Sequence, residues 1–250
     1  MQAASLRKQQ EPRKQHEPRK QKNRPAFTLV ELLVVTTILG VLMGLLMPAV
    51  QSARAVARRT HCGSNMRQVG LGVLMFADTH NGKWPETTHS VEPDSETGDF
   101  TKAWIYTVAP YLESVDAIRI CPDDPLAADR LKAKLTSYTL NGWLSNEAKP
   151  AFDRMRTITE PSKSILAFEL SEIKGLDVYA DHVHSFNWFG KTAKAKGTVF
   201  TGVSNEVSVG RHAGFAHYLY ADGRVDLVNA SDIASWCSAP FSAPEFSKPR

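Results

Sequence analysis

The carboxylate of Glu31 is the charged group in this sequence that most needs a chemical explanation. It lies in an apolar run of 24 residues, Phe27 to Val50, that contains no other charge. A charge at the edge of a bilayer costs a few kcal/mol unless it pairs or reaches the interface. If the chain is cut just before Phe27, the new ammonium of a neighbouring subunit can pair with Glu31. A glutamate that reaches for water near the helix end is the simpler alternative.

Two histidines at alternate positions form a candidate metal site. His182 and His184 lie in a predicted strand, in which side chains at i and i+2 share one face. Two imidazoles on one face could hold a transition metal. No third ligand stands at a suitable spacing in the sequence, so a solvated polar segment is the alternative.

A second histidine group comes near the C-terminal end of the chain. His212 and His217 precede Asp222-Gly223, a dipeptide typical of a hairpin turn because glycine readily takes a positive φ. The group could act in catalysis or bind a metal. The turn chemistry of Asp222 favours a structural role for His212, Asp222 and Gly223.

A carboxylate-rich loop contains Asp123, Asp124 and Asp129. Hard cations such as calcium need several oxygen ligands, and this loop has no recognised calcium pattern. No metal or other cofactor is therefore assigned. The sequence also lacks a G-x-S-x-G elbow, a P-loop and a G-x-G-x-x-G motif, so we expect no enzymatic activity.

The three cysteines, Cys62, Cys121 and Cys237, are too few for a disulfide scaffold. Cys62 lies on the apolar stripe of a predicted helix. Cys121 ends a short apolar run, Ala117–Cys121, that is a plausible partner for this stripe. We expect a Cys62–Cys121 bridge with Cys237 unpaired, and two buried free thiols are the alternative.

These residues depend first on an N-terminal membrane helix. Residues 27–50 as a helix span about 36 Å, enough for a hydrocarbon core of about 30 Å. Residues 1–26 hold eight basic and two acidic side chains and are expected to be disordered. The heavier positive charge places this leader in the cytoplasm and residues 51–250 outside. A buried soluble helix, a cleaved signal peptide and a basic arm for nucleic acid are less well supported.

The helix is expected to continue beyond the membrane through residues 51–82. One apolar stripe recurs there at spacings of three and four, which indicates an amphipathic helix: Cys62, Met66, Val69, Val73 and Phe76. Asn81-Gly82 supplies a stop. The sequence predicts one helix from Phe27 to His80, about 80 Å long. Gly40 and Gly44 form a small-residue spacing that lets membrane helices approach closely.

The remainder predicts an α+β head over residues 83–237 and a loose tail over 238–250. Thr101–Leu112 and Asn229–Cys237 are predicted helices, and residues 190–198 a flexible basic loop. The predicted strands are Ser137–Leu144, Ser164–Leu170, Val178–Ala180, Phe215–Ala221 and Val225–Val228.

The segment KNRPAFTLVELLVV resembles the prepilin cleavage and methylation segment of type IV pilins and type II secretion pseudopilins. The resemblance implies cleavage between Ala26 and Phe27 by a prepilin peptidase and N-methylation of Phe27. It makes Glu31 the acid at the fifth mature position and Pro48 the helix-bending proline. This family usually has glycine before the cut, whereas this chain has Ala26. The implied fold is pilin-like, with a long N-terminal helix packed on a small, mainly antiparallel sheet.

The head resembles prepilin-like proteins with a DUF1559-type domain and an H-X9-DG motif. Cys62 and Asn65 match a Cys-x-x-Asn helix segment, and His212 with Asp222-Gly223 matches H-X9-DG. Further blocks are CPDDP from Cys121, SYTLNGW from Ser137 and EPSKSILAFE from Glu160. The resemblance implies topology more than activity.

The function we expect is that of a structural subunit of a type IV pilus-like or type II secretion-like assembly. Its partners would be a prepilin peptidase, other pilin-like subunits through the helix, and the bacterial inner membrane, which it crosses once, but not nucleic acid. The alternative is a membrane-tethered extracytoplasmic binding module that forms no filament and recognises a polysaccharide or surface partner. Its tryptophans could serve there, although burial is their expected fate: Trp84, Trp104, Trp143 and Trp188. An enzyme built on His212 and Asp222 is the third hypothesis.

Overall fold

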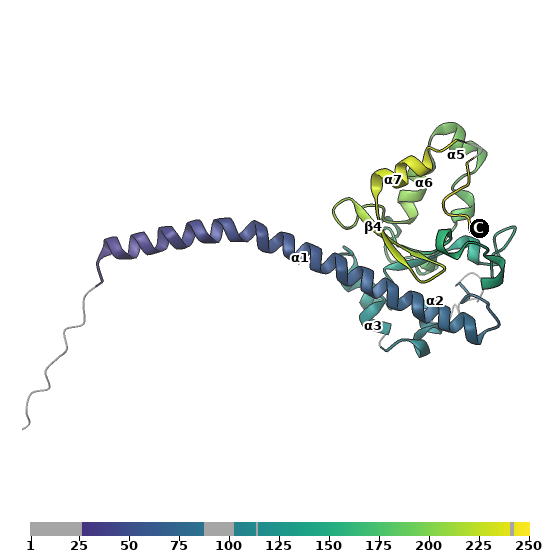
Figure 1. Ribbon diagram of the computed structural model, residues 1–250, viewed down its shortest axis with the longest axis horizontal. Coiled ribbons are helices and arrows are strands. Elements are labelled where there is room, and N and C mark those ends of the chain that lie inside the picture. The colour runs from purple at the N-terminus through teal and green to yellow at the C-terminus, as the bar shows by residue number, and fades with distance from the viewer. Residues whose placement is uncertain (1–26, 88–102, 114, 241–242) are drawn as a thin grey trace, which may run out of the picture. The chain divides into compact units, whose positions relative to one another are not determined.

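The computed structural model describes residues 27–87, 103–113, 115–240 and 243–250, with the backbone alone for residues 178 and 179 (Figure 1). The chain divides into two compact units, residues 1–49 and residues 50–250. The cleavage site at Ala26 lies outside the described residues.

A single helix, α1 (Leu29–Thr79, 51 residues), runs through both units and includes Pro48. This confirms the predicted continuous helix, with ends that differ from the prediction by one or two residues. Its first turn is capped: the Thr28 hydroxyl accepts from the Glu31 N–H at 3.2 Å, and the Thr28 N–H donates to Glu31 Oε2 at 2.9 Å. At its other end, Asn81 and Gly82 take φ of 55° and 75° and stop the helix.

The head contains one five-stranded sheet in the order β3-β1-β2-β4-β5. Every neighbouring pair is antiparallel except β1 and β3, which confirms the mainly antiparallel head. The strands are β1 (Tyr138–Asn141), β2 (Ile165–Glu169), β3 (His182–Val183), β4 (Phe215–Tyr220) and β5 (Val225–Asn229).

Side chains alternate between the two faces of this sheet, and each face packs on different helices. On one face, Ala167 and its partner Leu219 pack with the buried stripe of α1, including Met66 and Val69. On the other, Phe168 and Tyr218 pack with α6 (Val199–Glu206) and α7 (Ala230–Cys237). The short helices are α2 (Trp104–Thr107), α3 (Val115–Ile118), α4 (Ala127–Lys132) and α5 (Lys191–Lys196).

Three local predictions were wrong. The helix predicted over Thr101–Leu112 is broken into α2 and a 3-10 turn, Ala109–Tyr111, because Pro110 has no N–H to continue the ladder. The strand predicted at Val178–Ala180 is a 3-10 turn, Val178–Asp181, and the strand follows it as β3. The predicted loop 190–198 contains α5, whose alanines and lysines favour a helix.

The C-terminal segment is held against the head over residues 243–250, where the sequence predicted a loose tail. The carbonyl of Arg250 accepts from the backbone N–H groups of Thr159 and Glu160 at 2.6 and 2.7 Å. The Asn141 side-chain amide donates to the Ser247 carbonyl at 2.6 Å, and Ser247 is fully buried. Hydrogen bonds from the head therefore fix this segment, although its proline-rich composition predicted a loose tail.

Candidate functional site

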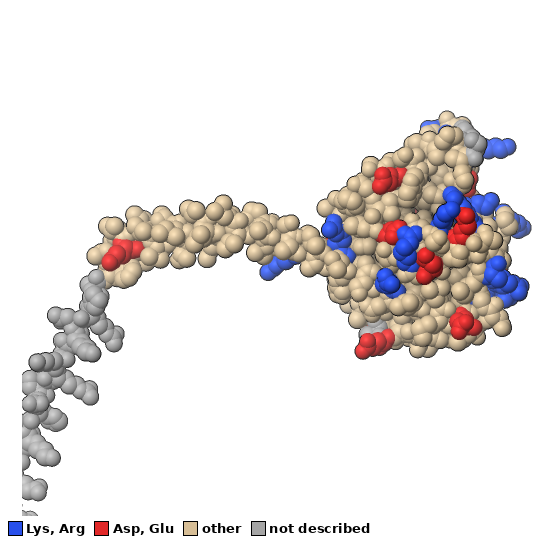
Figure 2. All heavy atoms as spheres, viewed as in Figure 1, with Lys and Arg blue, Asp and Glu red and all other residues tan. Residues whose placement is uncertain are grey.

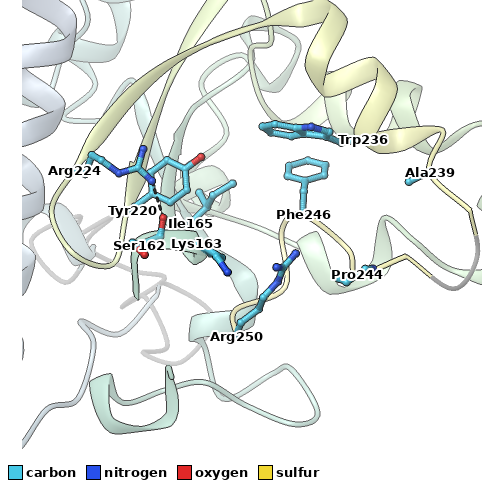
Figure 3. A pocket seen from close by; sticks show the side chains of 10 residues that line it. All are labelled: Ser162, Lys163, Ile165, Tyr220, Arg224, Trp236, Ala239, Pro244, Phe246 and Arg250. Atoms are coloured by element: carbon cyan, nitrogen blue, oxygen red, sulfur yellow. Dashed lines mark hydrogen bonds between the residues drawn. The ribbon is translucent and has the colours of Figure 1, made fainter. Parts of the chain in front are cut away.

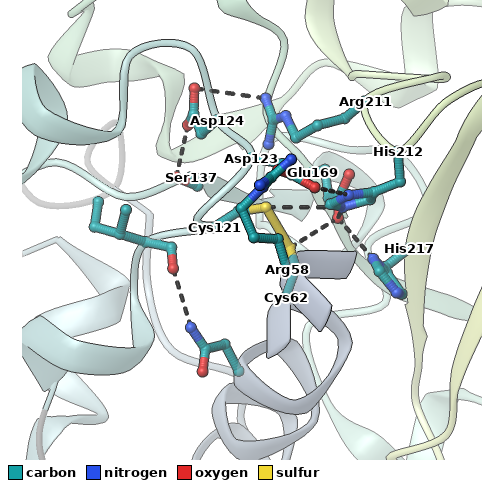
Figure 4. Close-up of a disulfide and its surroundings, with 12 residues drawn as sticks. Arg58, Cys62, Cys121, Asp123, Asp124, Ser137, Glu169, Arg211, His212 and His217 are labelled. Atoms are coloured by element: carbon teal, nitrogen blue, oxygen red, sulfur yellow. Dashed lines mark hydrogen bonds and ion pairs between the residues drawn. A yellow bond between two sulfur atoms is a disulfide. The ribbon is translucent and has the colours of Figure 1, made fainter. Parts of the chain in front are cut away.

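A buried polar site joins α1 to the sheet at the level of Cys62 (Figure 4). The structure links Cys62 and Cys121 in a disulfide, with Cα atoms 4.9 Å apart and a sequence separation of 59. Both cysteines are fully buried, and Cys237 is a buried free thiol. The bridge covalently ties α1 to the segment that follows α3.

Asn65, one helical turn after Cys62, strengthens the same junction. Its side-chain amide donates to the carbonyl of Ile120 at 3.0 Å and lies 3.5 Å from that of Ala117. Ala117 lies in the last turn of α3 and Ile120 just after it, where backbone carbonyls have no acceptor role within the helix and need other donors. The Cys-x-x-Asn spacing therefore places a covalent bond and an amide clasp on one face of α1.

Glu169 lies at the centre of the site, and its carboxylate contacts two histidines. Its Oε1 is 2.9 Å from His212 Nε2 and 2.9 Å from His217 Nδ1. His212 Nδ1 is 2.9 Å from Asp123 Oδ2, so the imidazole of His212 bridges two carboxylates. Figure 4 shows this group beside the disulfide. Sequence reasoning did not single out Glu169, although an acid at the end of the apolar strand ILAFE is a signal for a buried partner.

The charges in this group stabilise one another. Burial raises the pKa of Glu169, but hydrogen bonds from His212 and His217 and the charge of Arg211 outweigh it and lower the pKa to about 2. Burial has the opposite effect on His212 and lowers its pKa. The hydrogen bonds and negative charges of Glu169 and Asp123 outweigh burial and raise the pKa of His212 above its ordinary value. The His212 side chain is only 1% exposed, so this imidazole has little access to a substrate.

Two carboxylates of the loop considered for calcium, Asp123 and Asp124, have protein partners. Asp123 pairs with Arg58 of α1 as well as with His212. Asp124 is fully buried and accepts from Arg130 Nη1 and from the Ser137 hydroxyl, each at 2.6 Å. Both acids therefore bind side chains of other segments: Arg58 of α1, Arg130 of α4, Ser137 just before β1 and His212 just before β4.

Asp222-Gly223 is the turn between β4 and β5, as the sequence indicated. Asp222 Oδ1 accepts from the Arg224 N–H at 3.0 Å, and Gly223 has a φ of 83°. The H-X9-DG spacing thus spans β4 from His212, just before the strand, to the turn after it. His217 lies on this strand and packs against Gly63 of α1, where an added Cβ would lie 2.8 Å from the imidazole.

Two sulfurs, Glu169 and His212 also offer four ligand atoms within 4.8 Å of one another. Metal binding by cysteine requires thiolates. In the structure the two sulfurs are bonded to each other, so this group is a disulfide beside a buried ion network. The other predicted histidines, His182 and His184, lie elsewhere, at the β3 edge with Glu147.

The remaining predicted residues lie in the apolar first half of α1 or just before it. Phe27 is 71% exposed, and an added Cβ at Gly40 or Gly44 would meet nothing within 4 Å. Figure 2 shows the early part of α1 with almost no charge on the visible face. The described residues include one helix long and apolar enough to cross a membrane, α1, and its most apolar window is unburied. This helix and the prepilin motif fit a single-pass membrane anchor.

A pocket of about 360 Å³ opens beside β4 and α7 (Figure 3). Aromatic side chains and three cations line it: Tyr220, Trp236, Phe246, Lys163, Arg224 and Arg250. The four tryptophans considered for binding are buried instead, which confirms their expected place in the core.

Comparisons with known proteins agree with this organisation. The prokaryotic N-terminal methylation motif matches residues 21–47. A protein family of unknown function, DUF1559, matches residues 51–120, which includes Cys62 and Asn65 but ends before Cys121 and the H-X9-DG motif. No curated protein and no solved structure matches the chain. The two adjoining matches, with the long helix and mixed sheet, support a prepilin-like protein with a DUF1559-type head.

Proposed function

We propose that this protein is a structural subunit of a type IV pilus-like or type II secretion-like assembly. A prepilin peptidase cuts between Ala26 and Phe27 and methylates Phe27, and α1 holds the subunit in the inner membrane. The observation that carries the proposal is the methylation motif at residues 21–47, which includes the start of an unburied apolar helix at Leu29. An apolar helix surface of this kind needs lipid or other helices around it.

The surface of α1 suits packing against neighbouring helices. Gly40 and Gly44 lie four residues apart with open space above both. Such small residues let two helix backbones approach closely, which gains van der Waals contact in the membrane. Exposed leucines, valines and methionines surround them, so the contact is apolar.

Glu31 has a local role that must be separated from subunit pairing. Its carboxylate accepts from both the N–H and the hydroxyl of Thr28, at 2.9 and 2.7 Å, which is a capping box. Among the described residues Glu31 forms no ion pair, so its charge is available for a cation from outside the chain. The amine of a processed neighbour would supply that cation.

The test exploits the fact that glutamine also closes a capping box. Glu31→Gln keeps the cap and removes the charge, whereas Glu31→Ala removes both. Two differently tagged copies of each variant are expressed together in the native host, and their co-purification from crosslinked membranes is measured. We expect both variants to be cut at Phe27 and both to lose at least ~10-fold in co-purification, as expected for a lost charge pair in apolar surroundings. If Glu31→Gln co-purified as well as the wild type and only Glu31→Ala lost co-purification, the role of Glu31 would be to cap the helix and not to pair with a neighbouring subunit.

The pocket in Figure 3 favours a second candidate, a membrane-tethered binding module. Aromatic faces beside cations suit an acidic polysaccharide, which offers ring faces and carboxylates. Titration of the protein with acidic oligosaccharides, followed by the fluorescence of Trp236 against a Trp236→Phe control, tests it. Specific binding by a chain that never co-purifies with its own copies would favour the module over the subunit.

A further inference from the structure

A second cluster of ligating side chains lies at the β3 edge of the sheet and shares no residue with the disulfide site. It consists of Glu147, three residues after the 3-10 turn Gly142–Leu144, His182 in β3, and His184 two residues later. Each side chain offers one ligand atom, and the three atoms lie within 4.8 Å of one another. Glu147 is the third ligand that the sequence alone did not reveal.

The distances in this cluster are close to those of a metal coordination shell. Glu147 Oε1 is 3.5 Å from His182 Nε2, and Glu147 Oε2 is 3.8 Å from His184 Nε2. An ion held about 2.0–2.1 Å from each ligand in a tetrahedron separates the ligand atoms by about 3.4 Å. The two glutamate–histidine separations are close to this spacing, and the three ligand atoms together lie within 4.8 Å of one another.

A carboxylate faces the other nitrogen of each imidazole. Asp181 Oδ1 is 2.8 Å from His182 Nδ1, and Glu206 Oε1 is 3.8 Å from His184 Nδ1. Glu206 is itself fixed by the Trp188 indole N–H at 2.6 Å. Metal-binding histidines typically donate this second N–H to a carboxylate, which directs the lone pair of Nε2 at the ion. Both Nε2 atoms here face Glu147.

We propose that Glu147, His182 and His184 bind a divalent first-row transition ion, and that Zn²⁺ is the ion best suited to two imidazoles and one carboxylate. His182 is fully buried, while the His184 and Glu147 side chains are 36% and 26% exposed. The ion therefore enters from the His184 side, where a water molecule completes its coordination. Glu147, Asp181 and Glu206 supply the negative charge that a dication needs.

The test is titration of the detergent-solubilised full chain with Zn²⁺ by isothermal titration calorimetry, without reductant so that the Cys62–Cys121 bridge stays closed. We expect one Zn²⁺ per chain and a rise in Tm. His184→Ala and Glu147→Gln should weaken binding at least ~10-fold, and Asp181→Asn about 10–100-fold because the second shell tunes affinity. His61→Ala, which removes an exposed histidine of α1, should bind as wild type does.

Near-ultraviolet circular dichroism of each metal-free variant verifies its fold. Co²⁺ provides a measurement on the wild type alone, since tetrahedral coordination gives intense visible absorption bands that Zn²⁺ should abolish by displacement. Failure of the wild type to bind either ion above the level of a chelator-treated blank would overturn the proposal. So would equal affinity in wild type and His184→Ala, because the ion would then lie elsewhere.

Discussion

At the scale of single residues, Glu169 is the buried acid that links β2 to the two histidines near the start of β4. It is fully buried and takes hydrogen bonds from two histidines on either side of the start of β4. His212 and Asp222 could be found from their spacing, because a turn dipeptide marks the hairpin. Glu169 could not, since its partners come from segments 43 and 48 residues away and only the fold brings them together.

Replacing Glu169 by glutamine should lower the free energy of unfolding by about 3 kcal/mol, the usual cost of breaking a buried charge pair. Urea denaturation at pH 5.5 measures it. A matched Glu172→Gln variant changes an exposed acid and should stay within about 0.5 kcal/mol of wild type. If both variants unfolded at the same urea concentration, Glu169 would have no such role.

The same network predicts a stability optimum in mildly acidic solution. The pKa of Glu169 falls from 4.5 to about 2, so its contribution is complete above pH 4.5 and is lost as the pH falls through 2. The pKa of His212 is raised from 6.5, so its contribution is complete below pH 6.5 and is lost as the pH rises through the raised value. Unfolding free energies measured from pH 3 to 9 should therefore peak between about 4.5 and 6.5. A wild-type curve that keeps rising above pH 7 would contradict a charged His212.

The disulfide is a prediction at the same scale. Closing a loop of 59 residues restricts the unfolded chain and contributes up to ~4 kcal/mol. Cys62→Ser with Cys121→Ser should thus lower Tm strongly, whereas Cys237→Ser, which changes the free buried thiol, should have a smaller effect. Thermal melts with and without dithiothreitol provide the comparison. Insensitivity of wild-type Tm to reductant would mean that the bridge carries no stability.

At the scale of elements, hydrophobic periodicity was sufficient for α1 and for the β4–β5 hairpin. The predicted stripe is buried from Cys62 to Val73 and partly buried at Phe76, and Asn81-Gly82 ends the helix. Periodicity failed where a short element depends on local chemistry. Pro110 splits one helix, and glycines on either side of α5 delimit a helix that composition alone assigned to a loop.

The packing of α1 on β4 depends on glycines that the apolar pattern did not reveal. A Cβ added at Gly70 would lie 2.5 Å from Leu219 Cδ1, a fully buried side chain. Gly70→Ala should therefore destabilise the head by about 1–3 kcal/mol despite the better helix propensity of alanine. In the matched control, Gly202→Ala in α6, the new methyl meets nothing within 4 Å and should stabilise by up to about 1 kcal/mol. Denaturant midpoints of the two variants should shift in opposite directions; a shift in the same direction would refute the tight contact.

At the scale of the whole molecule, the chain joins a methylation motif, an apolar helix and a disulfide-pinned head. The motif and the first half of the helix were readable from sequence because their order and charge are linear features. The contacts between the helix and the head could be predicted only in part. The sequence predicted the Cys62–Cys121 pairing, but the contacts of Asn65 with Ile120 and of Cys62 with Glu169 depend on tertiary structure.

The residue before the cleavage site gives a further prediction for the whole chain. This family usually has glycine there, so Ala26→Gly should leave processing intact or speed it. Pulse-chase labelling of the precursor and mature forms measures the rate. A replacement by a bulky residue, Ala26→Leu, serves as the contrast and should slow the conversion. Equal rates for all three forms would show that residue 26 is not part of the recognised site.

Processing as a prepilin is tested most directly by the mass of the N-terminal peptide of the membrane-bound protein from its native host. We expect a chain that begins at Phe27 and carries one methyl group on its terminal amine. An intact terminus at Met1, or a terminus created by cleavage beyond residue 50, would contradict a mature subunit anchored by α1.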